Sequence, residues 1–261
     1  VAYYKKLFQT IGNIIELIEK DDIPKYLLFL ENAFPYMDNY NYHKGMNGII
    51  QELTGLLKTK NIGTDSARAL LLDFQATLET KPEKAIKLEK DALAQIETIT
   101  ADNARLVSNL HANLGGLYRM NAHPDLAREH MEKSISLLDQ FNLLHINDSI
   151  PKIANYAMFL TEQQEPERGI SELQKLSGII KEYHSDDCLD YAKVQETLGT
   201  IYLMTDNLQQ SKTHFKRAFK IYEKIWADEP EMIEVKYQEI QELYPQIGFC
   251  IGKNLSGLLT K

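Results

Sequence analysis

A self-similar pattern with a period of 42 residues constrains the fold of this chain more than any other feature. Residues Leu114–Tyr118 read Leu-Gly-Gly-Leu-Tyr, and residues Leu198–Tyr202 read Leu-Gly-Thr-Ile-Tyr, 84 positions later. Midway between them, residues Tyr156–Leu160 read Tyr-Ala-Met-Phe-Leu. Repetition at about 20 to 50 residues is the signature of stacked structural repeats. The period therefore predicts a chain of similar units rather than one irregular core.

Each of these segments is followed by a turn and then by a small and a larger apolar residue at constant offsets. The turns are expected at residues 121–124, 163–166 and 205–207, which are rich in helix-stopping residues. Apolar residues at helical spacing, with small residues where two helices must approach closely, predict a pair of short antiparallel helices in each unit. The small and larger residues are Ala127 and Met131, Gly169 and Leu173, and Ser211 and Phe215.

The same period extends the pattern toward both ends of the chain. A backward step reaches Leu72, which begins a fainter copy, and a second step reaches Leu30, where the run after Pro35 obscures the register. A forward step reaches Ile240, after which Pro245 breaks the pattern. Terminal units of a repeat stack are commonly atypical, because they must cap an otherwise exposed core.

We therefore predict one all-α domain over residues 1–261, a right-handed superhelical solenoid of antiparallel helix pairs with about five to six repeats. Residues 1–65 are expected to hold an N-terminal helix and a degenerate repeat. Residues 66–228 should form three to four clear repeats, and residues 229–261 an incomplete repeat that caps the stack. Only 13 Gly and 8 Pro interrupt the 261 residues, which leaves little room for strands.

The motifs resemble the tetratricopeptide repeat (TPR) family over roughly residues 66–224. The 42-residue period is similar to that of the long-helix subtype of kinesin light chains. The resemblance implies a non-catalytic scaffold that binds a protein or a peptide. It also implies two bacterial settings, the C-terminal sensor array of an NB-ARC (STAND-type) signalling ATPase, or the peptide-sensing half of a quorum-sensing regulator without its DNA-binding domain. Tyr156-Ala157 departs from the family's Leu-Gly, so local packing is expected to differ there.

The resemblance further implies where a partner would bind. In the family geometry the first helix of each pair lines a concave groove, and the residue before the Leu or Tyr anchor points into it. Here these residues are Asn113, Asn155 and Thr197. An Asn amide has one acceptor and two donors, so it can bond the backbone of an extended peptide. The alternative is that Asn113 and Asn155 bond adjacent helices within the scaffold. The other residues expected on this wall are Asn109, Arg119, Lys152, Lys193, Glu196 and Thr200.

Composition excludes several other classes of function. The formal charge of −8 disfavours binding to a phosphate backbone. Cys188 and Cys250 are too sparse for a disulfide framework, which favours a reducing cytoplasm. No apolar stretch approaches the roughly 20 residues that span a bilayer. The chain begins at Val1 rather than Met, which suggests a piece of a longer protein.

No motif predicts catalysis, a cofactor or a metal. Gly248–Asn254 is one residue short of a phosphate-binding loop and ends in the wrong side chain. His184–Cys188 is interpreted as a helix-capping link, in which Ser and Asp act as N-caps, rather than as a metal or nucleophile cluster. His123 and His130 are seven positions apart with no partner ligand nearby. The aromatic stretch Phe34–Tyr42 is either part of a packed repeat or a contact with a partner.

Overall fold

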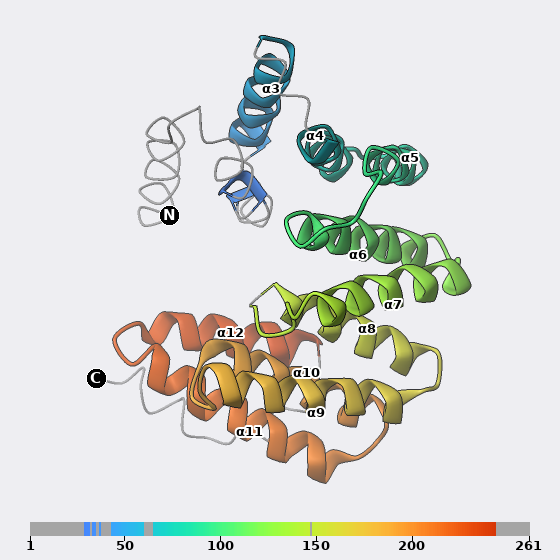
Figure 1. Ribbon diagram of the computed structural model, residues 1–261. Coiled ribbons are helices and arrows are strands. Elements are labelled where there is room, and N and C mark those ends of the chain that lie inside the picture. Colours follow the sequence, from blue (N-terminus) through green and yellow to red (C-terminus); the bar gives the residue numbers. More distant parts are fainter. Residues whose placement is uncertain are drawn as a thin grey trace. The chain divides into compact units, whose positions relative to one another are not determined.

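The structure is a computed structural model that describes residues 29–31, 33–34, 37, 43–59, 65–146 and 148–243. Throughout these ranges the regular elements are helices, with no strand (Figure 1). The all-α fold is confirmed. The helices are α3 His43–Thr59, α4 Asp65–Thr77, α5 Pro82–Leu93, α6 Ala104–Met120, α7 Pro124–Gln140, α8 Ser149–Glu162, α9 Pro166–Tyr183, α10 Leu189–Met204, α11 Leu208–Ile225 and α12 Pro230–Leu243.

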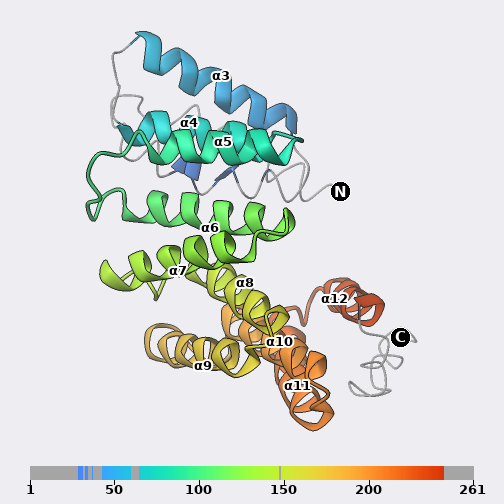
Figure 2. The ribbon, with the colours of Figure 1, turned by 90° about the vertical axis from the view of Figure 1, so that its right-hand side faces the viewer.

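The chain forms two compact units, Val1–Leu137 and Leu138–Lys261. In the first unit α4 packs against α5, and α5 packs against α6. In the second unit α8 packs against α9, α10 against α11, and α12 against α11 (Figures 1 and 2). Successive helices joined by short turns run antiparallel, so each unit is built from helix pairs. A single domain over residues 1–261 stays a prediction.

The anchor residues of the repeat are buried at equivalent positions, by which we mean positions separated by the 42-residue period. Leu114, Tyr156 and Leu198 expose 0%, 5% and 2% of their surface. Leu30, two steps before Leu114, and Ile240, one step after Leu198, expose 0% and 3%. The burial predicted for Leu114, Tyr156 and Leu198 is confirmed. The equivalent Leu72 of α4 is only half-buried.

The turns inside the helix pairs also repeat with the period. Each contains one residue in the left-handed region, with φ of 56° at Ala122, 65° at Gln164 and 58° at Asp206. In each turn the N–H of the next residue donates to the carbonyl five residues earlier, which is the Schellman arrangement that closes a helix C-terminus. The three bonds are His123 to Tyr118 at 2.9 Å, Glu165 to Leu160 at 2.8 Å and Asn207 to Tyr202 at 2.8 Å.

Glycines permit the close approach of the two helices in each clear pair. A Cβ built on Gly115 would lie 2.6 Å from Met131 Cγ, and one on Gly199 would lie 2.7 Å from Phe215 Cδ2. Both glycines belong to first helices. In the α8–α9 pair the glycine is on the second helix instead, where a Cβ on Gly169 would lie 2.7 Å from the carbonyl oxygen of the first helix, at Ala157. Where Tyr156-Ala157 replaces the Leu-Gly motif, the glycine at the helix contact therefore lies on the second helix of the pair instead of the first.

Two sequence features fall partly or wholly outside the described residues. The segment Gly248–Asn254 lies outside them, as does Cys250. Most of the stretch Phe34–Tyr42 does too, but the Phe34 ring stacks on the Phe74 ring of α4 at a centroid distance of 3.8 Å and is 2% exposed. Packing between successive repeats therefore accounts for Phe34.

Candidate peptide-binding surface

Asn113 lies on α6 with its side-chain amide bonded to the preceding helix pair. Its Nδ2 atom donates to Asp73 Oδ1 of α4 at 2.8 Å and to Glu89 Oε1 of α5 at 3.2 Å. Although the residue is exposed overall, both of its amide hydrogens are thereby engaged. At this position the structure contains the scaffold bonds that were one of the two alternatives for the asparagines.

The two acceptors of Asn113 form a buried carboxyl pair. Asp73 and Glu89 expose 8% and 2% of their surface. Glu89 Oε2 is buried and has no hydrogen-bond partner within the described residues. Burial raises the pKa of Glu89 well above its ordinary value, and the charge of Asp73 and a hydrogen bond with it act in the same direction, against the opposing bond from Asn113. The pair is a buried acidic site.

Sequence reasoning missed this pair, although the period contains a signal for it. The positions equivalent to Asp73 hold Gly or Ala, and those equivalent to Glu89 hold large apolar residues. In the α6–α7 and α10–α11 pairs these two positions make the tight crossing of the two helices. Two carboxyls at this crossing therefore distinguish the α4–α5 pair from the later pairs, whose equivalent positions are apolar. The equivalents of Asp73 are Gly115, Ala157 and Gly199, and those of Glu89 are Met131, Leu173 and Phe215.

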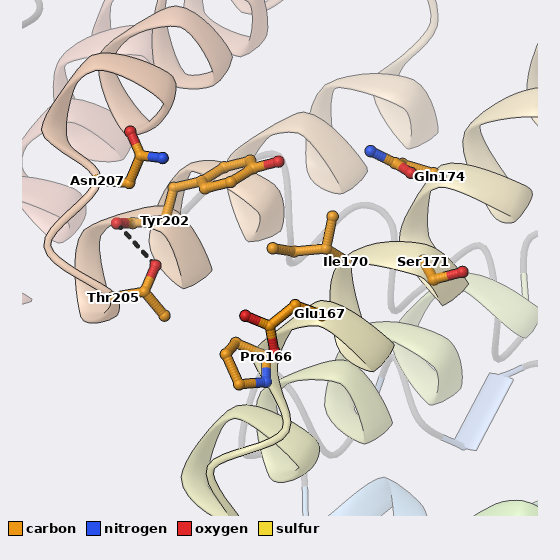
Figure 3. Close-up of a pocket in the computed structure, with 8 residues that line it drawn as sticks. All are labelled: Pro166, Glu167, Ile170, Ser171, Gln174, Tyr202, Thr205 and Asn207. Atoms are coloured by element: carbon orange, nitrogen blue, oxygen red, sulfur yellow. Dashed lines mark hydrogen bonds between the residues drawn. The ribbon is translucent and has the colours of Figure 1, made fainter.

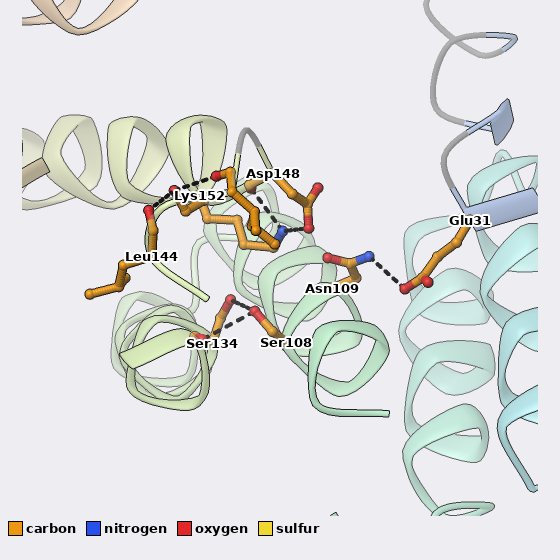
Figure 4. A network of polar contacts seen from close by, with 9 residues as sticks. Glu31, Ser108, Asn109, Ser134, Leu144, Asp148 and Lys152 are labelled. Carbon is orange, nitrogen blue, oxygen red and sulfur yellow. Dashed lines mark hydrogen bonds and ion pairs between the residues drawn. The ribbon is translucent and has the colours of Figure 1, made fainter. Parts of the chain in front are cut away.

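Asn155, at the position equivalent to Asn113, lies on α8 in the second unit and is exposed. Across the described ranges nothing forms a hydrogen bond with its side chain, so its acceptor and both donors face solvent. On the same helix Lys152 Nζ donates to the Asp148 carbonyl at 2.9 Å and to the Asp148 carboxylate at 2.5 Å (Figure 4). The Lys152 side chain is only 8% exposed. Of these two predicted groove residues, Asn155 is therefore the one available to a ligand.

The predicted residues of α10 divide into exposed and internal ones. The Lys193 side chain is 54% exposed, with its Nζ atom 3.8 Å from the Asp190 carboxylate. The hydroxyls of Thr197 and Thr200 donate to carbonyls of their own helix, at Lys193 and Glu196, over 3.0 Å and 3.1 Å. Thr200 is 9% exposed. Lys193 is thus presented to solvent, whereas Thr200 lies largely inside.

The Glu196 carboxylate of α10 contacts side chains from two other helices of the second unit. Its Oε2 atom accepts from the Tyr222 hydroxyl of α11 at 2.6 Å, and its Oε1 atom lies 2.9 Å from Lys236 Nζ of α12. Burial, followed by the charge of Glu196, raises the pKa of Tyr222. For Lys236, burial opposes the charge, but the carboxylates of Glu196 and Glu239 prevail and raise its pKa. Glu196 therefore has a structural role.

The remaining predicted residues lie on α6. Asn109 is half-buried, and its Nδ2 atom donates to Glu31 Oε1 at 3.2 Å (Figure 4). Its Oδ1 atom is buried without a partner in the described part of the chain. Arg119 is half-buried in the last turn of the helix. Asn109 thus resembles Asn113 in holding an acidic side chain of the same unit.

At two equivalent positions a histidine of the second helix lies within hydrogen-bonding distance of a side chain of the first helix, which sequence reasoning did not anticipate. His111 Nδ1 of α6 lies 2.9 Å from His130 Nδ1 of α7. In the second unit Gln195 Oε1 of α10 lies 2.9 Å from His214 Nδ1 of α11. Burial, then the charges of His130 and Lys133, lowers the pKa of His111 to about 4. Burial also lowers the pKa values of His130 and His214. These histidines are neutral parts of the packing.

The link His184–Cys188 caps α10, as expected, but a different residue forms the cap. The N-cap is Cys188, whose Sγ atom accepts the Tyr191 N–H at 3.5 Å, while Ser185 Oγ accepts the Asp187 N–H at 3.1 Å. Cys188 is a free thiol. Within the described ranges no group of three or more His, Cys, Asp or Glu side chains is placed to hold a metal ion.

A cavity of about 430 Å³ lies in the second unit, between the first half of α9 and the end of α10 (Figure 3). Ile170 and Tyr202 supply its apolar surface, and the polar groups around them are uncharged except for Glu167. It includes none of the residues predicted for the groove. Its lining residues are Pro166, Glu167, Ile170, Ser171, Gln174, Tyr202, Thr205 and Asn207.

Comparison with known families identifies the repeat in the second unit. Residues 149–224 match the model of the tetratricopeptide repeat family. This segment begins with α8 and ends within α11, so it comprises two helix pairs. TPR repeats generally mediate interactions between proteins, and Asn155 lies within the matched segment. No curated protein sequence matches the chain.

Solved structures extend the likeness in fold beyond the TPR segment. BtubC (BKLC) from P. vanneervenii has a TM-score of 0.60 and 17% identity, over 78% of this chain and 82% of that chain. A putative kinesin light chain from Podosopora anserina, with nearly identical TPR-like repeats, has a TM-score of 0.55 and 11% identity, over 77% and 97%. At these identities the likeness concerns the fold. In the described ranges, no helix is long and apolar enough to cross a membrane.

Proposed function

We propose that this chain is a non-catalytic module that binds a protein or an extended peptide along the first helices of its TPR pairs. The observation that carries the proposal is Asn155, an exposed amide on α8 whose three hydrogen-bonding groups are unused within the described residues. Lys193, exposed on α10, adds a cation in the same unit. A side chain that offers donors and an acceptor suits the backbone of a peptide irrespective of its sequence.

The wider setting follows from the TPR resemblance. The proposal places the chain in a larger intracellular signalling protein of a bacterium, as the sensor array that follows an NB-ARC-type ATPase, with an upstream domain covalently linked to it. The second candidate is the peptide-sensing half of a transcriptional regulator. Sequence upstream of Val1 distinguishes them, because a phosphate-binding loop and a helix-turn-helix have different motifs.

The proposal is tested with peptides selected against the whole chain from a random display library. A photo-reactive amino acid at position 155 should cross-link to a selected peptide. The same amino acid at Lys216, an exposed position on the second helix α11, serves as the matched control. Cross-linking that is equally efficient at both positions would place the peptide elsewhere.

The energetic part of the test compares two alanine variants. Asn155→Ala should weaken peptide binding by roughly three- to tenfold, because it removes hydrogen bonds to the ligand. Lys216→Ala should leave the affinity unchanged. Melting temperatures of both should match that of the unmodified chain, since neither side chain holds the scaffold. Unchanged affinity in Asn155→Ala would refute the assignment.

A further inference from the structure

The carboxyl pair of the first unit has a geometry that two ionised carboxylates would not maintain. Asp73 and Glu89 both accept from one amide nitrogen, at 2.8 Å and 3.2 Å, and each is at least nine-tenths buried. Two negative charges that share one donor in a buried site repel strongly. One proton between them removes the repulsion and turns one carboxyl into a donor for the other.

The unpartnered oxygen supports the same conclusion. Glu89 Oε2 is buried and receives no hydrogen bond in the described part of the chain. An ionised carboxylate requires donors for both oxygens, whereas a neutral acid tolerates such a site at much lower cost. The charged group that acts on Glu89 from α4 is Asp73, and the residue that faces it from α6 is the uncharged Asn113. Neither can neutralise a carboxylate.

The pair also determines what Asn113 can offer a ligand. An Asn amide has two N–H groups and one oxygen. With Nδ2 donating to both carboxyls, Oδ1 is the group left with bonding capacity on an otherwise exposed residue. Asn155, at the equivalent position, retains all three.

We propose that Asp73 and Glu89 share one proton and form a positioning pair, which holds Asn113 by its N–H groups and presents its oxygen as an acceptor for a ligand N–H. The ligand-binding part of this inference rests on the proposed function. Position 113 would then select a donor from the peptide, whereas position 155 accepts either a donor or an acceptor. Asp73 and Glu89 do not themselves touch the ligand.

The shared proton is tested without any ligand, by nuclear magnetic resonance on the whole chain. The carboxyl carbons of Asp73 and Glu89 should titrate as a coupled pair, with one step at higher pH than the exposed glutamates in the same spectrum. The side-chain amide protons of Asn113 should exchange with water at least tenfold more slowly than those of Asn155, the internal control. Ordinary titration of both carboxyls, or equal exchange of the two amides, would overturn the pair.

A conservative variant separates this role from simple packing. Glu89→Gln replaces the protonated acid by a neutral group of the same shape, so Asn113 should stay protected. Because folding raises the pKa of Glu89, stability that depends on its proton is fully present below the ordinary value of 4.5 and is lost as the pH rises through the raised value. The melting temperature of the unmodified chain should therefore fall relative to Glu89→Gln as the pH rises. Parallel curves would contradict the proposal.

The ligand-binding part is tested with a selected peptide methylated at one backbone nitrogen at a time. One methylation should weaken binding to the unmodified chain by roughly three- to tenfold and have no further effect on Asn113→Ala. If no methylation is coupled to Asn113, the acceptor role is wrong while the shared proton is judged by the resonance data. If no peptide binds at all, the proposed function and the acceptor role both fail.

Discussion

The α4–α5 pair and the α8–α9 pair have equivalent positions but fill their helix crossings with different chemistry. In α4–α5 the crossing contains Asp73 and Glu89, which bind the amide of Asn113. In α8–α9 the same positions hold Ala157 and Leu173, both 0% exposed. An apolar crossing gains its stability from close contact and offers no hydrogen bond to a neighbouring helix. The polar crossing of α4–α5 instead binds a side chain of the next helix, Asn113 of α6.

The difference teaches that equivalent positions in a repeat do not have equivalent availability. Asn113 and Asn155 occupy the same place on α6 and α8, but one is held by two carboxyls and the other is exposed and unbonded within the described residues. The acceptors of Asn113 come from a preceding pair, so its own helix gives no sign of them. Availability to a ligand therefore depends on the neighbouring repeat.

The apolar crossing is the most sensitive to added volume. Gly169→Ala would place a Cβ 2.7 Å from the backbone oxygen of Ala157, which cannot move without displacing α8. We expect a loss of about 2–3 kcal/mol in the free energy of unfolding, measured by urea denaturation. Gly178→Ala, on the same helix with nothing within 4 Å, is the control and should gain up to about 1 kcal/mol from helix propensity. Equal effects would show that the crossing is not tight.

Removing the amide at the polar crossing should have the next largest effect. Asn113→Ala leaves Asp73 and Glu89 without their shared donor, so we expect a loss of about 2 kcal/mol in unfolding free energy. Asn155→Ala should change it by less than about 0.5 kcal/mol, because the side chain is exposed and holds no partner. The two variants differ only in their repeat. Equal unfolding free energies of the two variants would show that Asn113 contributes no more to stability than Asn155.

The His111–His130 and Gln195–His214 pairs extend the comparison of the two units to pH dependence. The pKa of His111 is lowered from 6.5 to about 4. The stability that depends on its neutral ring is therefore fully present above pH 6.5 and is lost as the pH falls toward about 4. His111→Gln copies the Gln195–His214 pair of the second unit and should reduce the acid-dependent loss of unfolding free energy. The reduction should be about 1 kcal/mol, since solvent screens the half-buried ring. Urea denaturation at pH of about 7 and about 5 measures it.

The reciprocal variant serves as its control. Gln195→His installs a histidine pair in the second unit, beside His214 of α11. Burial opposes a second positive charge there, so this variant should lose more stability on acidification than the unmodified chain. Identical acid sensitivity in all three proteins would mean that neither pair contributes to the pH dependence.

Much of the fold was predictable because its causes are local and periodic. The burial of Leu114, Tyr156 and Leu198 follows from apolar residues at helical spacing, and the turns follow from residues that stop helices. Helix pairs repeat because each apolar face needs a similar neighbour. The position of a glycine such as Gly169 was visible, but its role became clear only from its contact with the opposite helix.

The candidate site was less predictable, because side-chain partners come from other helices. Glu196 was expected to face a ligand, yet it binds Tyr222 and Lys236 of two later helices. Thr200 was expected on the same wall but is 9% exposed. A register predicts which face of a helix a residue occupies. It does not predict which long side chain from α11 or α12 reaches across to that face.

Local sequence patterns are enough to predict the helical repeat, the 42-residue spacing and the equivalent positions of Asn113 and Asn155. Those properties depend on helix periodicity, small residues and turn residues, which act over a few positions. The contacts of Asp73 and Glu89 with Asn113, and the exposure of Asn155, depend on how the helices pack. Hydrogen bonds between side chains join atoms 24 or 40 positions apart in the chain, and their geometry exists only once the helices have packed.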